Sequence, residues 1–383
     1  MVNPQKELLN YWGGFMENKK IVIISNYIYP MTNPRATRAT ELAKQFARLG
    51  HDVVLYGVLG SFDYESFEKD NNIKVKNIRK LLFATLNSDG VHSKNILKRA
   101  LVKLFRKSLE FPSIELMFKI PRIIRGEQDI DLLITIANPH SIHWGAALYK
   151  SLSSKQFPKK WLADCGDPFM GNKFEKHYFY FKYLEKHFCR QVDQIIVPIE
   201  GAIKGYYSEF HDKISVIPQG FDFKSITLNK DYKKNVIPTF AYSGTFYQDI
   251  RDPRELLDYL MSQDLNFKFI IFTNNPHLLG PYIDKLGEKM EINSYIPRFE
   301  LLHVLSTMDF LVNLENGTQI QSPSKLIDYA LTGRPILSVN SKGLNKTKID
   351  QFLRGDYSGG LVVDNIEQYN IQNVVSEFLK CAD

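Results

Sequence analysis

Residues 321–339 read QSPSKLIDYALTGRPILSV, and the predicted fold starts from this stretch. The small residues at 322–324 are types that begin helices. Apolar side chains then recur at helical spacing until Gly333, a residue type that commonly ends a helix. Residues 336–339 predict a buried parallel strand. The stretch therefore predicts a loop, a short helix and a strand in that order.

The start of this helix has the properties of a phosphate site. Its first backbone N–H groups lack partners within the helix, and the helix dipole places partial positive charge there. Lys325 in the first turn adds a full positive charge, and Asp328, one turn later, can accept hydrogen bonds from a ribose. These features favour a diphosphate at the helix start. The same residues equally fit an ordinary capped helix between two strands.

The chain has 383 residues, of which 44% are hydrophobic and 24% are charged. This length exceeds one typical core and predicts two domains, and the composition is that of a soluble globular protein. The first residues show no apolar leader, and no apolar run is long enough to span a membrane. Cys165, Cys189 and Cys381 show no paired or metal-type spacing, which indicates free thiols. We therefore expect a cytoplasmic protein without a metal centre.

The net charge of +7 comes from one segment. Residues 94–125 contain nine Lys or Arg and two Glu, which accounts for the whole excess. Within residues 93–109, apolar and basic side chains fall on opposite helical faces, a pattern typical of membrane-surface helices. The alternative is a helix that packs in the domain with solvated cations. No nucleic-acid-binding module is recognisable, so we expect membrane contact through residues 93–125 and no nucleic acid partner.

The first half of the chain alternates strands and helices. Residues 21–25 and 53–56 predict strands, and residues 41–49 predict the amphipathic helix between them. Such a βαβ unit opens a doubly wound parallel sheet, so the predicted fold class is α/β.

Residues 26–38 predict a polar loop at the carboxyl edge of the first strand, where ligands bind in such sheets. The loop lacks the three-glycine fingerprint of dinucleotide-binding proteins, which argues against a nicotinamide cofactor. It carries Arg35 and Arg38 instead. These cations suit an anionic acceptor, and the alternative is ordinary surface charge.

Titratable side chains follow two further predicted strands. Asp164 and Asp167 come after a strand at 161–163, and His143 lies in the helix start after a strand at 131–136. Side chains at the carboxyl edge of a parallel sheet are well placed for chemistry. For the carboxylates the alternative is turn formation, and for the histidine it is packing in a cleft or capping a helix.

The second half repeats the architecture after a polar linker at 224–235. A strand at 239–243 runs into Gly244 and Thr245, and Arg251 follows in the next loop. Two α/β halves joined by a linker imply a cleft between them. We predict an N-terminal domain of residues 1–228 and a C-terminal domain of residues 229–383, whose last helix is a candidate to pack back on the first domain.

Taken in order, these motifs resemble a glycosyltransferase of the GT-B fold, most like family 4, over about residues 20–379. The motifs are RLGHDV at 48–53, ADCGDP at 163–168, VIPQGFD at 216–222, YSGT at 242–245 and SPSKLIDY at 322–329, which continues into GRP at 333–335. The resemblance implies two Rossmann-like domains facing a central cleft. It also implies a nucleotide-sugar donor in the C-terminal domain, an acceptor in the N-terminal domain, and a retaining reaction that needs no metal or cofactor.

The resemblance also assigns donor-binding residues. Asp328 matches the second of two acidic residues, which binds the donor ribose; the first falls on Ile320, so that carboxylate is missing. Through the resemblance, the loop before the helix would hold the diphosphate, mainly by backbone N–H groups. The residues that this assigns to the donor are Ser322, Ser324, Lys325 and Leu326.

A basic pair follows the first strand of the C-terminal domain in the family. Arg251 stands near its second member, whereas Thr245 and its neighbour stand where the first cation is expected, so that partner is absent. Ile296 lies in a segment that resembles the one contacting the base through its backbone. The family's catalytic histidine falls near residues 165–167, where this chain has none. Asp164, Asp167 or His143 would have to replace it.

The sequence therefore predicts a hexosyltransferase that moves a sugar from a UDP- or GDP-sugar to a hydroxyl of a lipid-linked glycan acceptor. We expect it to act in capsular, O-antigen or other cell-envelope polysaccharide synthesis, as a peripheral protein at the inner face of the membrane. One alternative is a GT-B sugar-nucleotide epimerase, which would need carboxylates for acid–base chemistry and no basic membrane helix. The other is a non-catalytic nucleotide-binding module, which the missing carboxylate and histidine favour.

Overall fold

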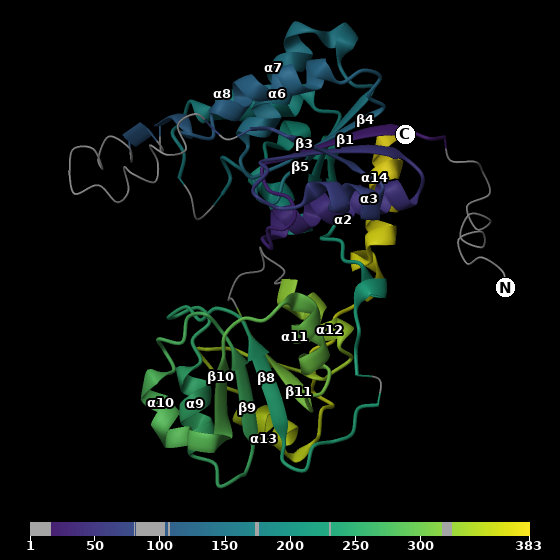
Figure 1. The fold of residues 1–383 in the computed structure, drawn as a ribbon. Helices are drawn as coiled ribbons and strands as arrows, with labels where there is room; N and C mark the ends of the chain where they lie inside the picture. The colour runs from purple at the N-terminus through teal and green to yellow at the C-terminus, as the bar shows by residue number, and fades with distance from the viewer. Residues whose placement is uncertain are drawn as a thin grey trace, which may run out of the picture. The chain divides into compact units, whose positions relative to one another are not determined.

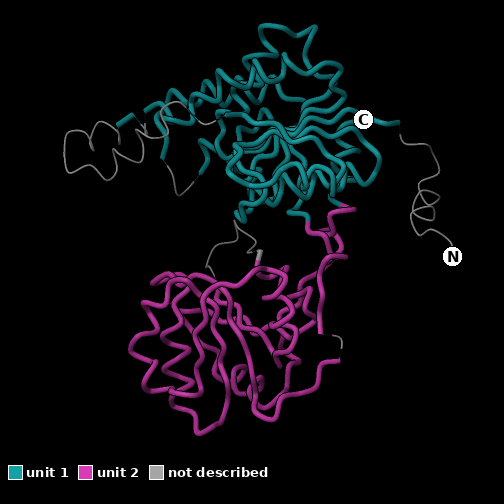
Figure 2. The backbone as a smooth tube through the Cα atoms, viewed as in Figure 1, with its two compact units in different colours: residues 1–220, 374–383 teal, residues 221–373 magenta. Residues whose placement is uncertain are grey.

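The computed structural model describes residues 17–79, 81, 104–105, 108–172, 176–229, 231–315 and 324–383. The chain forms two compact units: unit 1 comprises residues 1–220 and 374–383, and unit 2 comprises residues 221–373 (Figure 2). The division thus falls eight residues before the expected boundary at 228. The last ten residues of the chain belong to unit 1.

Unit 1 is built on a seven-stranded parallel sheet of order β3-β2-β1-β4-β5-β6-β7. The strands are β1 (Lys20–Ser25), β2 (Asp52–Gly57), β3 (Lys74–Asn77), β4 (Leu132–Ile136), β5 (Lys160–Asp164), β6 (Gln194–Val197) and β7 (Ile214–Val216). The strand order reverses beside β1, the kind of position where ligands bind in doubly wound sheets.

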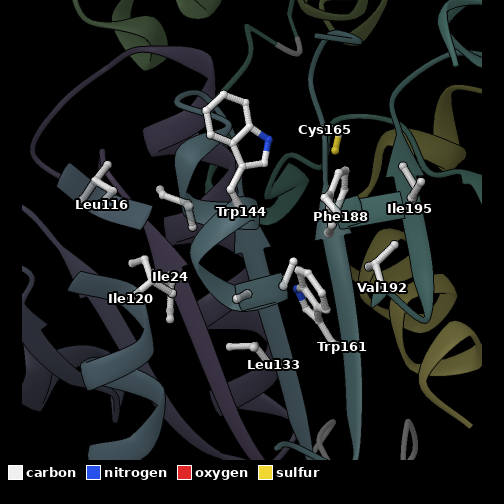
Figure 3. Packing of buried hydrophobic residues seen from close by; sticks show 14 of the residues in the cluster. Ile24, Leu116, Ile120, Leu133, Trp144, Trp161, Cys165, Phe188, Val192 and Ile195 are labelled. Atoms are coloured by element: carbon white, nitrogen blue, oxygen red, sulfur yellow. The ribbon is translucent and has the colours of Figure 1, made fainter. Parts of the chain in front are cut away.

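Helices cover both faces of this sheet. They are α2 (Pro34–Arg48), α3 (Tyr64–Asn71), α6 (Glu115–Gly126), α7 (Ser141–Leu152) and α8 (Phe181–Gln191), with short 3-10 turns η1 (Ser154–Gln156), η2 (Glu200–Gly205) and η3 (Ser208–Lys213). The helices α6, α7 and α8 lie on one face, and α2 and α3 lie on the other (Figure 1). Between the sheet and α7 and α8, Trp144, Trp161 and Phe188 fill the core (Figure 3).

Unit 2 has a five-stranded parallel sheet of order β10-β9-β8-β11-β12. Its strands are β8 (Thr239–Ser243), β9 (Lys268–Phe272), β10 (Met290–Asn293), β11 (Phe310–Leu314) and β12 (Ile336–Val339). Its helices are α9 (Arg254–Met261), α10 (Gly280–Leu286), α11 (Arg298–Leu305), α12 (Ser324–Leu331) and α13 (Lys346–Arg354), with 3-10 turns η4 (Phe223–Ser225), η5 (Gly287–Lys289) and η6 (Ile366–Tyr369). The last helix, α14 (Ile371–Ala382), begins in unit 2 and ends in unit 1.

Alternate residues of the unit 2 strands belong to two hydrophobic clusters, one on each face of the sheet. Phe240 stacks on Phe269 and Phe310, at centroid distances of 4.7 and 4.5 Å, in the cluster under α9, α10 and α13. The neighbouring residues Ala241 and Leu311 belong to the opposite cluster, with side chains of α11 and α12. Strands buried on both faces explain why these segments read as nearly continuous apolar runs. The two parallel sheets confirm the predicted α/β, doubly wound fold class.

The prediction of a polar loop over residues 26–38 is wrong at its end. Helix α2 begins at Pro34, because the Asn33 side chain accepts hydrogen bonds from the amides of Arg35 and Ala36, at 3.1 and 2.9 Å. Such an N-cap followed by proline is a favourable helix start. Arg35 and Arg38 therefore lie on a helix.

Other boundaries also differ from the prediction. The aromatic-rich residues 174–190 predict one helix, but α8 begins at Phe181. Residues 361–363 predict a strand and form none. Helix α6, which contains Pro121, was not predicted. The predicted basic helix at 93–109 falls mostly outside the described residues. In the part of the chain that the structure describes, no helix is long and apolar enough to cross a membrane.

Candidate functional site

The carboxyl edge of the unit 2 sheet carries most of the predicted donor-binding residues. Helix α12 starts at Ser324, in agreement with the predicted helix start. Ser322 and Ile320 fall in residues 316–323, outside the described part of the chain. Tyr329 of α12 accepts a hydrogen bond at 2.8 Å from the amide of Ser243, the last residue of β8. This bond fixes the helix to the strand that leads into the site.

Lys325, in the first turn of α12, lies against a tyrosine of β8. Its Nζ donates to the Tyr242 hydroxyl at 3.1 Å and stands 4.5 Å from the centre of that ring. Burial, together with the smaller effect of the charge of Arg251, lowers the pKa of Lys325 to about 7. Among the described residues, no carboxylate forms an ion pair with Lys325. This partly buried ammonium therefore has no compensating carboxylate among the described residues.

Gly244 provides the space for this ammonium. Its φ of +147° lies in a region that favours glycine, and a Cβ there would stand 2.0 Å from Lys325 Nζ. The next residue, Thr245, contacts the Tyr295 hydroxyl through Oγ1 at 3.0 Å. Any side chain at position 244 would therefore displace the ammonium.

Arg251 closes a turn that follows β8. Its amide donates to the carbonyl of Tyr247 at 2.9 Å, and its guanidinium lies 5.9 Å from the centre of the Tyr247 ring. Arg251 is half-buried, and its charge acts on Lys325. The structure thus brings Gly244, Thr245, Arg251 and Lys325 together, as the sequence predicts.

Asp328, the predicted ribose ligand, has a partner that the sequence analysis missed. Arg298, the first residue of α11, donates to Asp328 Oδ1 from both Nε, at 3.0 Å, and Nη2. The Arg298 guanidinium also lies 4.3 Å from the centre of the Phe221 ring. Burial raises the pKa of Asp328, and the charge of Arg298 opposes that shift. Ile296 and Leu326 pack against the apolar cluster under α11 and α12.

The carboxyl edge of the unit 1 sheet is organised differently. Asp164, at the end of β5, is 1% exposed and accepts hydrogen bonds from Arg38 Nε at 2.5 Å and Arg35 Nη1 at 3.2 Å. Arg38 is also buried, and its remaining nitrogens donate to the carbonyls of Ile217 and Pro218. These cations, predicted for an anionic acceptor, are engaged with Asp164.

His143 is a core residue in this structure. It has no exposed surface, its Nδ1 lies 2.8 Å from Thr135 Oγ1, and its Nε2 lies 3.3 Å from Cys165 Sγ. Its ring stacks on Phe188 at 5.0 Å. Burial lowers the pKa of His143 to about 3, so the side chain is neutral at physiological pH. In this structure the imidazole is therefore enclosed and neutral. Asp167, by contrast, is exposed in the loop after β5.

The loop after β5 is hydrogen-bonded to the buried carboxylate of Glu185, a residue that the sequence did not indicate. The amide of Met170 donates to Glu185 Oε1 at 3.1 Å, and Glu185 Oε2 has no hydrogen-bond partner among the described residues. Burial raises the pKa of Glu185 to about 7. The sequence signal was weak, because a single Glu inside a predicted amphipathic helix reads as a solvated side chain.

Comparison with known proteins places the chain among sugar-transferring enzymes. Residues 36–225 match the model of Glycosyltransferase Family 4. The chain is a glycosyltransferase of the GT-B fold that resembles family 4. No curated protein matches the sequence.

Solved structures support the fold of this glycosyltransferase. A glycosyltransferase from Rickettsia africae matches with a TM-score of 0.62 at 12% identity, over 96% of this chain and 98% of its own. HepE of Anabaena, in complex with UDP and glucose, matches with a TM-score of 0.59 at 9% identity, over 95% and 99% of the two chains. A putative UDP-N-acetylglucosamine 2-epimerase from Listeria monocytogenes matches at 0.54 and 14%, over 96% of both chains. At these identities the likeness concerns the fold.

Proposed function

We propose that unit 2 binds a nucleoside diphosphate sugar, a UDP- or GDP-sugar, at the carboxyl edge of its sheet. The observation that carries the proposal is the partly buried Lys325 ammonium at the start of α12, which pairs with no carboxylate of the described residues. A diphosphate supplies the missing negative charge and accepts hydrogen bonds from the helix start. Arg251 adds a second cation, and Gly244 leaves the space in which the Lys325 ammonium lies.

The remaining donor groups follow from neighbouring residues. Asp328 is proposed to bind the ribose, with Arg298 holding its Oδ1 so that the carboxylate keeps one orientation. The base is proposed to lie along residues 295–297, next to the Tyr295 hydroxyl that contacts Thr245. HepE, which shares the fold, was solved with UDP and glucose, and this supports a uridine nucleotide as the first donor to test.

The chemical step needs positive charge where the donor bond breaks. The acceptor hydroxyl oxygen forms a bond to the anomeric carbon, and the bond between that carbon and the diphosphate oxygen breaks. The electron pair leaves with the diphosphate, and the acceptor proton passes to a leaving phosphate oxygen. Lys325, Arg251 and the start of α12 stabilise the developing negative charge, as oxyanion-hole donors do. We propose retention of configuration, as the resemblance implies, and a reaction that needs no metal or cofactor.

The acceptor is proposed to be a lipid-linked glycan, reached at a membrane surface through unit 1. We use the name aromatic surface for the exposed side chains Phe105, Leu109, Phe179, Tyr180 and Tyr183. Tyr180 joins its two segments by donating a hydrogen bond to the carbonyl of Ser108. Phe179 and Tyr183 are 70% and 62% exposed, an unusual state for large aromatic side chains of a soluble protein.

The sequence around two members of this surface suits an anionic membrane. Phe105 and Leu109 belong to residues 94–125, whose sequence carries the whole net positive charge of the chain. Anionic lipid attracts each nearby Lys or Arg by about 1 kcal/mol. Aromatic side chains also favour the boundary between lipid and water. The protein would then be a peripheral cytoplasmic enzyme at the inner face of the membrane, acting in cell-envelope polysaccharide synthesis.

Flotation with vesicles tests the membrane contact. We expect wild type to float with phosphatidylcholine vesicles that contain phosphatidylglycerol, and less with phosphatidylcholine alone. The double variant Phe179→Ser, Tyr183→Ser should lose most of this binding. Leu152→Ser, which alters a 74% exposed leucine at the end of α7, is the matched control and should bind as wild type. Equal binding of all three proteins would refute the membrane contact.

The donor is tested by screening UDP, GDP and other nucleoside diphosphates for a rise in melting temperature, since a bound ligand stabilises the folded state. The nucleotide-sugar of the best binder is then incubated with and without a lipid-linked glycan fraction. We expect sugar transfer that depends on the acceptor. Release of an epimerised sugar without acceptor would instead identify an epimerase, the activity for which the Listeria monocytogenes protein of this fold is named. Tight binding with no turnover would support the non-catalytic module.

A further inference from the structure

Tyr242 lies behind Lys325 in the proposed donor site and makes two hydrogen bonds of opposite direction. Its hydroxyl donates to the carbonyl of Thr245 at 3.2 Å and accepts from Lys325 Nζ at 3.1 Å. Because the carbonyl takes the hydroxyl proton, the oxygen lone pairs face the ammonium. The hydroxyl is therefore oriented as an acceptor for Lys325.

The position of this hydroxyl is fixed by packing. Tyr242 is 1% exposed, and its ring stacks on Phe246 at 4.7 Å with an interplanar angle of 15°. The ammonium also fills the space beside Gly244, where a Cβ would stand 2.0 Å from Lys325 Nζ. Lys325 Nζ is thus confined between a phenol ring and a turn of backbone.

The charged groups around Lys325 do not neutralise it. From the turn after β8, Arg251 adds positive charge. On α12 itself, Asp328 is engaged by Arg298 from α11, and Tyr329 is a neutral phenol that bonds β8. The undescribed residues 316–323 contain no Asp or Glu. Among the described residues, the Tyr242 hydroxyl is therefore the polar group that accepts a hydrogen bond from the ammonium, and burial keeps the pKa of Lys325 near 7.

We propose that Tyr242 is a positioning residue for the diphosphate of the donor, and that donor binding is coupled to uptake of a proton by Lys325. This inference rests on the proposed function of unit 2. A diphosphate beside Lys325 favours the charged ammonium, so the pKa of Lys325 rises when the ligand binds. Affinity is then greatest below the pKa of the free protein and falls as pH rises through it, by up to about tenfold per pH unit.

Removing the Tyr242 hydroxyl deletes its hydrogen bond with Lys325 and keeps the aromatic ring. Tyr242→Phe keeps the stacking on Phe246 and the contact of the ring face with Lys325, and it deletes only the acceptor. Loss of one such hydrogen bond predicts about fivefold weaker binding. Without the acceptor the pKa of Lys325 drops, so the fall in affinity begins at lower pH than in wild type.

The test is calorimetric titration with UDP and GDP between pH 7 and pH 9, in two buffers of different ionisation enthalpy. Wild type should take up protons on binding, and Tyr242→Phe should shift the affinity profile to lower pH. Lys325→Met should bind weakly, with no proton uptake and a flat profile. Tyr259→Phe, which loses a 2.6 Å bond to Asp350 elsewhere in unit 2, should match wild type.

The outcomes separate this inference from the proposed function. If wild type binds UDP or GDP without proton uptake, or if Tyr242→Phe keeps the wild-type affinity and pH profile, the inference is wrong and the donor site stands. If wild type binds neither nucleotide at any pH, the proposed donor site itself is refuted. Melting curves of all four proteins check that each variant is folded.

Discussion

The carboxyl edges of the two sheets differ in how their charged side chains are paired. At the edge of the unit 1 sheet, the buried Asp164 accepts hydrogen bonds from the buried Arg38 and the half-buried Arg35, so each charge meets its opposite. At the edge of the unit 2 sheet, Lys325 meets a phenol and a second cation. Two edges with the same topology therefore differ at one cation each: Arg38 pairs with Asp164, whereas Lys325 has no carboxylate partner among the described residues.

This difference indicates what each edge can do. A buried ion pair is satisfied within the protein, and removing one partner is costly because the other charge stays buried. A buried ammonium without a carboxylate gains most from an added anion. We therefore interpret the ion pairs of Asp164 with Arg35 and Arg38 as stabilising unit 1, and the unit 2 edge as the donor site. Substitutions at the two edges test that contrast.

Breaking the ion pairs of Asp164 should destabilise unit 1. Asp164→Ala leaves Arg38, which is 2% exposed, without its carboxylate, and we expect a loss of about 3–5 kcal/mol in the free energy of unfolding. Urea unfolding followed by tryptophan fluorescence reports on unit 1 through the buried Trp144 and Trp161. Asp167→Ala, which alters an exposed neighbour, should change stability by less than about 0.5 kcal/mol. Similar stability of both variants would contradict the contrast.

Glu185 gives unit 1 a second, pH-dependent test. Its folded-state pKa of about 7 exceeds the ordinary value of 4.5, so the folded state binds more protons between those values. The stabilisation is complete below pH 4.5 and is lost as pH rises through about 7, by about 3 kcal/mol in all. Glu185→Gln should remove this dependence from urea unfolding curves recorded between pH 4.5 and pH 8. An unchanged slope in the variant would show that another group is responsible.

Removing the unit 2 ammonium should affect catalysis rather than folding. Lys325→Met deletes a cation that stabilises the leaving diphosphate, and loss of one such group lowers turnover by about 100-fold or more. Initial rates of sugar transfer, at saturating donor, measure this effect. Lys285→Met, which alters an exposed lysine on α10, should keep wild-type rates and is the control. If Lys325→Met keeps near-normal turnover, the difference in charge pairing between the two sheet edges has no role in catalysis.

The Arg298 contact predicts a smaller effect on donor affinity. Arg298→Met removes the partner of the Asp328 carboxylate. Burial then raises the pKa of Asp328 further, and the hydrogen bonds of Asp328 to the ribose should weaken. We expect about a tenfold increase in the KM for the donor, with little change in kcat, in line with the net value of a charged hydrogen bond. A fall in kcat with unchanged KM would instead place Arg298 near the reacting bond.

Local signals in the sequence predicted much of the fold. The strands at 239–243 and 336–339 match the structure because each is a short, largely apolar run that is mostly buried. The start of α12 followed from its small polar residues. The start of α2 was missed, although Asn33 and Pro34 mark it, because the polar first turns resemble a loop.

Pairings between distant residues were beyond sequence reasoning. Asp164 lies 126 residues from Arg38, and Asp328 lies 30 residues from Arg298, so no spacing rule connects either pair. His143 could equally line a cleft or fill a core, and only the contacts with Thr135 and Cys165 decide between them. The sequence identified which residues have useful chemistry, and tertiary contacts determine which of them remain available to a ligand.

A crystal structure of the protein with its nucleoside diphosphate is the most direct test of the central claim, that the unit 2 edge receives the donor. The measured quantity is the distance from Lys325 Nζ to the nearest diphosphate oxygen. We predict a hydrogen-bond distance of about 2.7–3.2 Å, with the diphosphate at the start of α12. A nucleotide bound elsewhere, or a diphosphate that leaves Lys325 in contact with Tyr242 alone, would contradict it.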